Sequence, residues 1–233
     1  MATLSRSRAA GAELLDGEHL DPGDLWINLR EMAMLNRLPG GVGDSLRAVT
    51  GLLDGTADAE PTVLDAGLGP GDFVRRLARR HPGARIIGFD AHPQVLAIAR
   101  RNLADTNHVT LLHADVRDIP LPDASVDVAH ASLLLHHLDP PDAVTALREM
   151  RRVARRGVVV NDLRRGPVAF AMTAATVLAL SRGRYTRHDG VLSSRRAYTL
   201  EELDEMAAAA GMRPASRSWG LLPRATTVYR WPR

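Results

Sequence analysis

The sequence contains no lysine and no cysteine: all 30 basic residues of its 233 are arginine. Without lysine, the chain cannot form a Walker A phosphate loop or a pyridoxal Schiff base. Without cysteine, it has no thiol nucleophile, no cysteine-ligated zinc, no iron–sulfur cluster and no disulfide. These two absences exclude several large classes of enzyme before any motif is considered.

Aromatic residues are also scarce, at 4%, and the formal net charge is only +3. The longest apolar stretch, from Val168 to Leu180, contains two threonines and is too short to span a bilayer. Met1–Ala10 is basic but precedes no apolar segment, so we expect no signal peptide, no membrane attachment and a cytoplasmic location. The arginines between Arg148 and Arg156 lack interleaved aromatics, which favours a solvated helix face over nucleic-acid binding.

Short β-rich runs alternate with helical patterns after residue 60, which predicts an α/β fold with a parallel sheet. The predicted strands are Thr62–Ala66, Arg85–Asp90, Val109–His113, Val126–Ala131 and Val158–Asn161, and the predicted helices between them are Asp72–Arg80, Pro93–Leu103 and Asp142–Ala154. Beyond them we expect a helix near Pro167–Ser181, an arginine-rich loop over Arg182–Arg196, a helix over Thr199–Gly211, and strands near Arg213–Ser218 and Thr226–Trp231. Residues 1–60 are expected to form an N-terminal helical cap on a domain spanning residues 61–233.

The central motif is a strand that runs into a glycine loop and then a helix. It reads Asp65-Ala66-Gly67-Leu68-Gly69-Pro70-Gly71, and these glycines allow a ligand to approach the backbone closely. A dinucleotide fingerprint would require a third glycine where Asp72 stands. The missing glycine, together with the absence of a Tyr-x-x-x-Lys pair, argues against an NAD(P)-binding oxidoreductase.

Acidic residues follow the next two predicted strands. Asp90, followed by Ala91, ends the second strand, where a carboxylate can accept both hydroxyls of a ribose. Asp115 follows the third strand, where it can accept from an adenine amino group while the Val116 N–H donates to the ring. Because ligands bind beyond the carboxyl ends of parallel strands, we expect these residues to share one site.

In order and spacing these motifs resemble the class I S-adenosylmethionine-dependent methyltransferases, from about Thr62 to the C-terminus. The resemblance implies a Rossmann-like, doubly wound, seven-stranded sheet, mostly parallel, with an antiparallel C-terminal hairpin. It also implies that the cofactor is S-adenosylmethionine. The residues that would hold this cofactor are Asp65, Gly67, Gly69, Gly71, Asp90, Ala91, Asp115, Val116 and His130. Arg37, at the end of an N-terminal helix, is a candidate partner for the carboxylate of the cofactor.

The fourth-strand segment ends in Leu135-His136-His137-Leu138, which resembles small-molecule methyltransferases. A phenolic acceptor would benefit from a base whose pKa lies near 7, and His136 is the candidate general base. We expect the two histidines to lie on a helix, where at most one faces the pocket. No metal site is predicted, because only Asn161-Asp162 matches the ligand set of the metal-dependent catechol methyltransferases.

The insertion from Asp162 to Arg196 is expected to build the acceptor site, with an apolar helix beside several arginines. Tyr185 and His188 are expected to help orient the acceptor, although a homodimer contact through the apolar helix is equally compatible. The sequence thus predicts a methyltransferase acting on oxygen of a phenolic or polyketide-like metabolite, typical of natural-product biosynthesis. N- or C-methylation of another metabolite and a non-catalytic cofactor-binding protein remain alternatives.

Overall fold

The computed structural model describes residues 8–9, 11, 13–17, 19–54, 60–219 and 223–232. A seven-stranded sheet with the strand order β3-β2-β1-β4-β5-β7-β6 forms its centre. The strands are β1 (Thr62–Ala66), β2 (Arg85–Asp90), β3 (Val109–His113), β4 (Val126–Ser132), β5 (Ala154–Leu163), β6 (Arg213–Trp219) and β7 (Arg224–Arg230). Strands β1 to β5 are parallel, and β7 runs antiparallel to both β5 and β6. The predicted doubly wound sheet with its C-terminal hairpin is confirmed.

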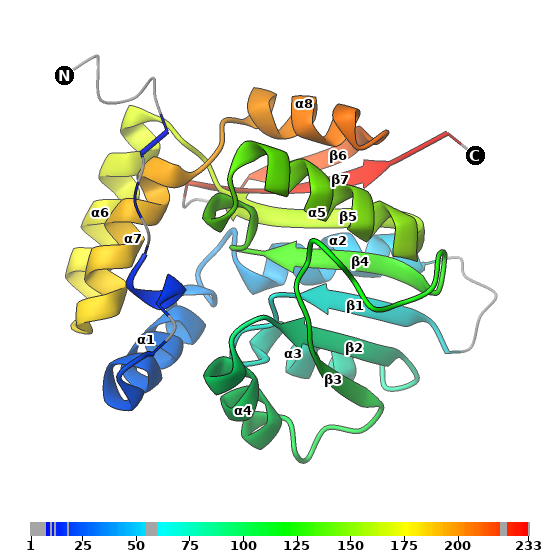
Figure 1. Ribbon diagram of the computed structural model, residues 1–233, viewed down its shortest axis with the longest axis horizontal. Coiled ribbons are helices and arrows are strands. Elements are labelled where there is room, and N and C mark those ends of the chain that lie inside the picture. The colour runs from blue at the N-terminus through cyan, green and yellow to red at the C-terminus, as the bar shows by residue number, and fades with distance from the viewer. Residues whose placement is uncertain are drawn as a thin grey trace.

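Helices cover both faces of this sheet (Figure 1). They are α1 (Pro22–Leu35), α2 (Val42–Leu53), α3 (Asp72–Arg80), α4 (Pro93–Asn102), α5 (Pro140–Val153), α6 (Pro167–Leu180), α7 (Arg184–Arg196) and α8 (Leu200–Ala209), with 3-10 turns η1 (Leu14–Asp16) and η2 (Leu135–His137). Alternate residues of a strand face opposite layers. Val63 therefore packs with α2, α3 and α4, whereas Leu64 packs with α5 and α8.

Helices α1, α6 and α7 gather at the end of the sheet toward which β1 and β4 point (Figure 1). Helix α7 packs against both α1 and α6. Since ligands of such sheets bind beyond the carboxyl ends of the strands, these three helices lie where an acceptor site is expected.

Two predictions are wrong. The helix expected over Asp142–Ala154 is present and ends at Val153, but β5 begins at once with Ala154 and not at Val158. Arg155 and Arg156 therefore lie on a strand and not on a basic helix face. Both bind the buried carboxylate of Asp127, at 3.1 and 3.0 Å, and this partner on β4 is not visible in local sequence.

The arginine-rich segment predicted as a loop is helix α7. Its buried face is mostly polar and comprises Tyr185, Thr186, Asp189, Ser193, Ser194 and Arg196. Apolar periodicity cannot detect a helix whose inward side chains are held by hydrogen bonds rather than by aliphatic packing. Three of these polar residues, Thr186, Asp189 and Ser193, line a cavity.

Some predictions fall outside the described residues. Most of the basic stretch Met1–Ala10 does, and residues 55–59 do as well, next to the proposed boundary at residue 60. Among the helices that are described, none has the length and apolar character needed to cross a membrane.

Candidate active site

A cavity of about 930 Å³ lies beyond the carboxyl ends of β1 to β4. Of the residues predicted to bind a cofactor, its wall includes Asp65, Gly67, Gly69, Asp90, Ala91, Asp115, Val116 and His130. The structure thus brings together eight predicted residues from four strands. Gly71 and Arg37 are not among the lining residues.

The glycine loop between β1 and α3 shapes the floor of this larger cavity. Gly67, Gly69 and Gly71 all have positive φ angles, of 66°, 53° and 89°, which disfavour residues with a Cβ. A Cβ added to Gly69 would meet nothing within 4 Å, so the space above it is open. A Cβ on Gly71 would instead lie 2.7 Å from Leu103, so this glycine is required by packing.

Asp90, at the end of β2, binds the main chain of the glycine loop. One carboxylate oxygen accepts from the Gly69 N–H at 3.1 Å, and the other accepts from the His92 N–H at 2.9 Å. Burial raises the pKa of Asp90 above its usual value. A carboxylate oxygen has more than one lone pair, so Asp90 retains acceptor capacity for a ligand in the cavity.

Asp115 is paired with Arg117. The carboxylate lies 2.6 Å from the guanidinium, which also binds Asp142 at 2.7 Å. The Arg117 hydrogen bond lowers the pKa of Asp115. The side chain of Asp115 is therefore ionised and held in place, and the buried Val116 follows it in the same wall.

The ring of His130 contacts side chains of β1, α2 and α3. Its Nδ1 lies 2.7 Å from Asp65, its Nε2 lies 2.9 Å from Ser45, and the ring stacks on Phe73 with centroids 3.9 Å apart. Both ring nitrogens thus have partners within the protein.

Arg37 lies near Asp72. Burial raises the pKa of Asp72, and the positive charge of Arg37 offsets part of this effect.

A second cavity, of about 110 Å³, adjoins the first. Both cavities are lined by Leu15, Asn28, Met32, Asn36, Leu133 and His137. The smaller cavity also reaches α6 and α7, where Thr173, Val177, Thr186, Asp189 and Ser193 form its wall. A compound in the smaller cavity would therefore lie next to one in the larger.

His136 lines the smaller cavity and is held by Asp162 at the end of β5. The His136 Nδ1 lies 2.6 Å from one Asp162 oxygen, which also accepts from the Leu163 N–H at 2.7 Å. The other oxygen accepts from the Leu135 N–H at 2.9 Å.

Burial alone would raise the pKa of Asp162, but the neighbouring His136, the Leu163 N–H and the Arg224 guanidinium hold it below its usual value. An ionised carboxylate only accepts hydrogen bonds. The His136 Nδ1 therefore donates to Asp162, so the ring nitrogen that can carry a lone pair is Nε2.

His137 also lines the smaller cavity, so the expectation that at most one of the two histidines faces the pocket is wrong. The two residues lie in the 3-10 turn η2, and their ring centroids are 4.4 Å apart. Neighbouring residues of a 3-10 turn are about 120° apart around its axis, so the turn itself does not bring the rings together; they converge through their side chains.

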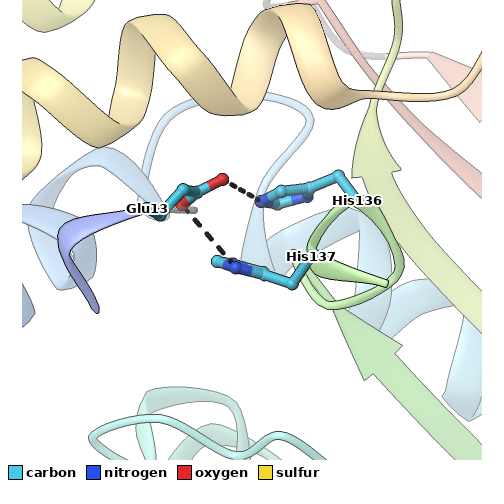
Figure 2. A group of neighbouring side chains, drawn as sticks. All are labelled: Glu13, His136 and His137. Carbon is cyan, nitrogen blue, oxygen red and sulfur yellow. Dashed lines mark ion pairs between the residues drawn. The ribbon is translucent and has the colours of Figure 1, made fainter. Parts of the chain in front are cut away.

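Figure 2 shows Glu13, a buried carboxylate that sequence reasoning missed, facing both histidines. Its oxygens lie 4.0 Å from His136 Nε2 and 3.6 Å from His137 Nδ1. The 4.0 Å separation from His136 Nε2 is too long for a hydrogen bond, whereas the carboxylate lies within ion-pair distance of the His137 ring. No local pattern marks Glu13, because His136, the nearer of its two histidine neighbours, lies 123 positions further along the chain.

The expectation that the arginines of this region face the acceptor is wrong. Arg182, Arg184, Arg187, Arg195 and Arg196 line neither cavity. Arg196, for example, is buried and binds the main-chain oxygens of His136 and His137. Tyr185 packs instead in a core cluster with Leu20, Leu25, Leu29 and Val95.

Part of the chain is similar in sequence to known proteins. Residues 63–157 match the model of a family described as a methyltransferase domain. The chain is 36% identical over 106 residues to malonyl-[acyl-carrier protein] O-methyltransferase from Serratia marcescens, covering 46% of this chain and 39% of that protein. It is 35% identical over 126 residues to demethylmenaquinone methyltransferase from Thermus thermophilus, covering 53% and 56% respectively.

Similarity in structure extends further along the chain. The structure of mitomycin 7-O-methyltransferase superposes with a TM-score of 0.67 at 20% identity, covering 96% of this chain and 62% of that one. At this identity the likeness shows the fold. The chain matches only about a third to just over half of the length of the curated relatives that head the comparison.

Proposed function

Because the chain contains a class I S-adenosylmethionine-dependent methyltransferase domain, we propose that the whole protein transfers a methyl group from that cofactor to an oxygen of a small acceptor. We further propose that the acceptor is phenolic or polyketide-like and belongs to natural-product biosynthesis. The structural likeness to a mitomycin O-methyltransferase supports this choice.

The residues of the larger cavity fit S-adenosylmethionine. The open space above Gly69 permits close approach to the backbone, and Asp90 retains lone pairs for the ribose hydroxyls. Asp115 and Val116 would hold the adenine, and Asp65, Gly67 and Ala91 complete the wall. The bound cofactor supplies a sulfonium methyl group that is already activated for transfer.

The observation that carries the proposal is the His136–Asp162 pair in the smaller cavity. The 2.6 Å contact orients the imidazole and leaves Nε2 free to accept a proton from a hydroxyl of the acceptor. Asp162 then stabilises the imidazolium that forms, because it is an ionised carboxylate in a buried site. The protein otherwise aligns the acceptor oxygen and excludes water, which is most of what this chemistry requires.

Replacing His136 with Gln tests this assignment. The variant should bind S-adenosylhomocysteine as the wild type does, while methyl transfer falls about 10²-fold or more, because general base catalysis is lost. We would measure binding by calorimetry and transfer by mass spectrometry, with a panel of single-ring phenols that includes catechol. The same substitution at the exposed His108 is the matched control.

Two results would contradict the proposal. Undiminished methyl transfer by the His136→Gln variant would show that His136 is not the general base. If the wild type binds S-adenosylhomocysteine but methylates no phenol in the panel, the proposal of a phenolic acceptor is wrong.

A further inference from the structure

Asn28, on α1, lines both cavities, and only 1% of the residue is exposed. Its Nδ2 donates to the Thr186 hydroxyl oxygen at 3.2 Å. Its Oδ1 is buried and has no hydrogen-bond partner among the described residues. A buried amide oxygen without a donor is unfavourable, and such groups in folded proteins call for a partner.

The orientation of the Asn28 amide is fixed by a neighbouring carboxylate. Glu31 accepts from the main-chain N–H groups of Arg182 and Gly183 and from the Thr186 hydroxyl. Since a carboxylate only accepts, the hydroxyl proton of Thr186 is committed to Glu31. The Thr186 oxygen can therefore only accept from Asn28, which assigns Nδ2 to that side and leaves Oδ1 on the unpaired side.

No residue that the structure describes supplies the missing donor, which points to a molecule in the cavities that Asn28 lines. The groups around the smaller cavity favour a donor-bearing molecule over an anion. Its ionisable lining residues include the buried carboxylates of Glu13 and Asp189, and Arg224 is already bound to Asn161 and Ser132.

We propose that the smaller cavity is the acceptor subsite and that Asn28 selects a single aromatic ring bearing two neighbouring hydrogen-bond donors. This inference rests on the proposed function and specifies its substrate class. One hydroxyl gives its proton to His136 Nε2 and receives the methyl group, while the second donates to Asn28 Oδ1. An acceptor that lacks the second donor leaves Asn28 unpaired and is discriminated against.

The size of the cavity limits the acceptor to one ring. It has about 110 Å³, less than the roughly 150 Å³ of an apolar cavity known to hold benzene, so a ring enters it only with part of its volume in the larger cavity that it adjoins. A larger acceptor would therefore place one ring beside His136 and Asn28 and extend the remainder into the neighbouring space.

Two probe compounds of nearly equal size test the inference. Catechol carries two adjacent hydroxyls, and in 2-methylphenol a methyl group replaces one of them. We would measure the dissociation constant of each by ligand-observed NMR, with protein saturated with S-adenosylhomocysteine. The wild type should bind catechol at least about tenfold more tightly than 2-methylphenol. In an Asn28→Leu variant, which keeps the branched shape of the side chain but has no acceptor, the ratio should fall to about twofold or less.

The same substitution at the exposed Asn107 is the matched control and should keep the wild-type ratio. The inference is overturned if the wild type binds neither probe, binds both equally, or keeps its preference after Asn28→Leu. It is also overturned if Asn28→Leu weakens the binding of S-adenosylhomocysteine tenfold, because Asn28 would then belong to the cofactor site. Failure of the wild type to bind S-adenosylhomocysteine would overturn the proposed function itself, which separates the two failures.

Discussion

Asp162 sets the state of His136 through the hydrogen bonds that it accepts. Every close polar neighbour of its carboxylate is a donor: the His136 Nδ1 and the N–H groups of Leu135 and Leu163. Asn at this position would place an NH₂ group against one of these donors. We expect Asp162→Asn to favour the wrong tautomer of His136, with the proton on Nε2, where it cannot act as a base.

The expected loss in turnover of catechol is about 10²-fold or more, with the affinity for S-adenosylhomocysteine preserved. Steady-state kinetics together with calorimetry measures both quantities, and Asp123→Asn at the surface is the control. Turnover of the Asp162→Asn variant within threefold of the wild type would show that Asp162 does not set the tautomer.

At the scale of elements, η1 is held over the smaller cavity by ion pairs and hydrogen bonds. The Asp189 carboxylate accepts from the Leu14 and Leu15 N–H groups, and His137 lies 3.0 Å from Asp16. Burial would lower the pKa of His137, but its hydrogen bond to Asp16 and the charges of Glu13 and Asp16 raise it above its usual value. When the imidazole is protonated, it therefore holds η1 against η2.

A histidine whose pKa is raised by folding adds stability that is complete below the unfolded pKa and disappears as the pH rises through the folded pKa. We expect His137→Gln to lower the free energy of unfolding by about 1 kcal/mol at pH 5.5, and by progressively less toward pH 8.5. Thermal unfolding of both proteins across this range measures the difference. A difference that stays constant or grows with pH would contradict the ion-pair account.

Elements built on aliphatic periodicity were predictable, and elements built on polar contacts were not. The first four parallel strands agree closely because their inward-facing residues alternate between two apolar layers. Helix α7 was missed because its inward face carries Asp189 and two serines, and the start of β5 was missed because its arginines bind Asp127.

At the scale of the whole molecule, the larger cavity was predictable and the smaller one was not. Asp65, Asp90 and Asp115 follow successive strands of a parallel sheet, and topology alone brings the ends of those strands together. The smaller cavity instead joins Glu13, Asn28, His136 and Asp189, which come from four segments far apart in the chain. Their meeting depends on how α1, α6 and α7 pack at the end of the sheet.

Calorimetric titration of S-adenosylhomocysteine into the wild type and an Asp90→Ala variant tests the central claim, that the larger cavity is an S-adenosylmethionine site. The account predicts one site in the wild type and at least about a tenfold weaker affinity in the variant, because two hydrogen bonds from the ribose to a carboxylate are lost. No binding by the wild type, or an unchanged dissociation constant in Asp90→Ala, would contradict it.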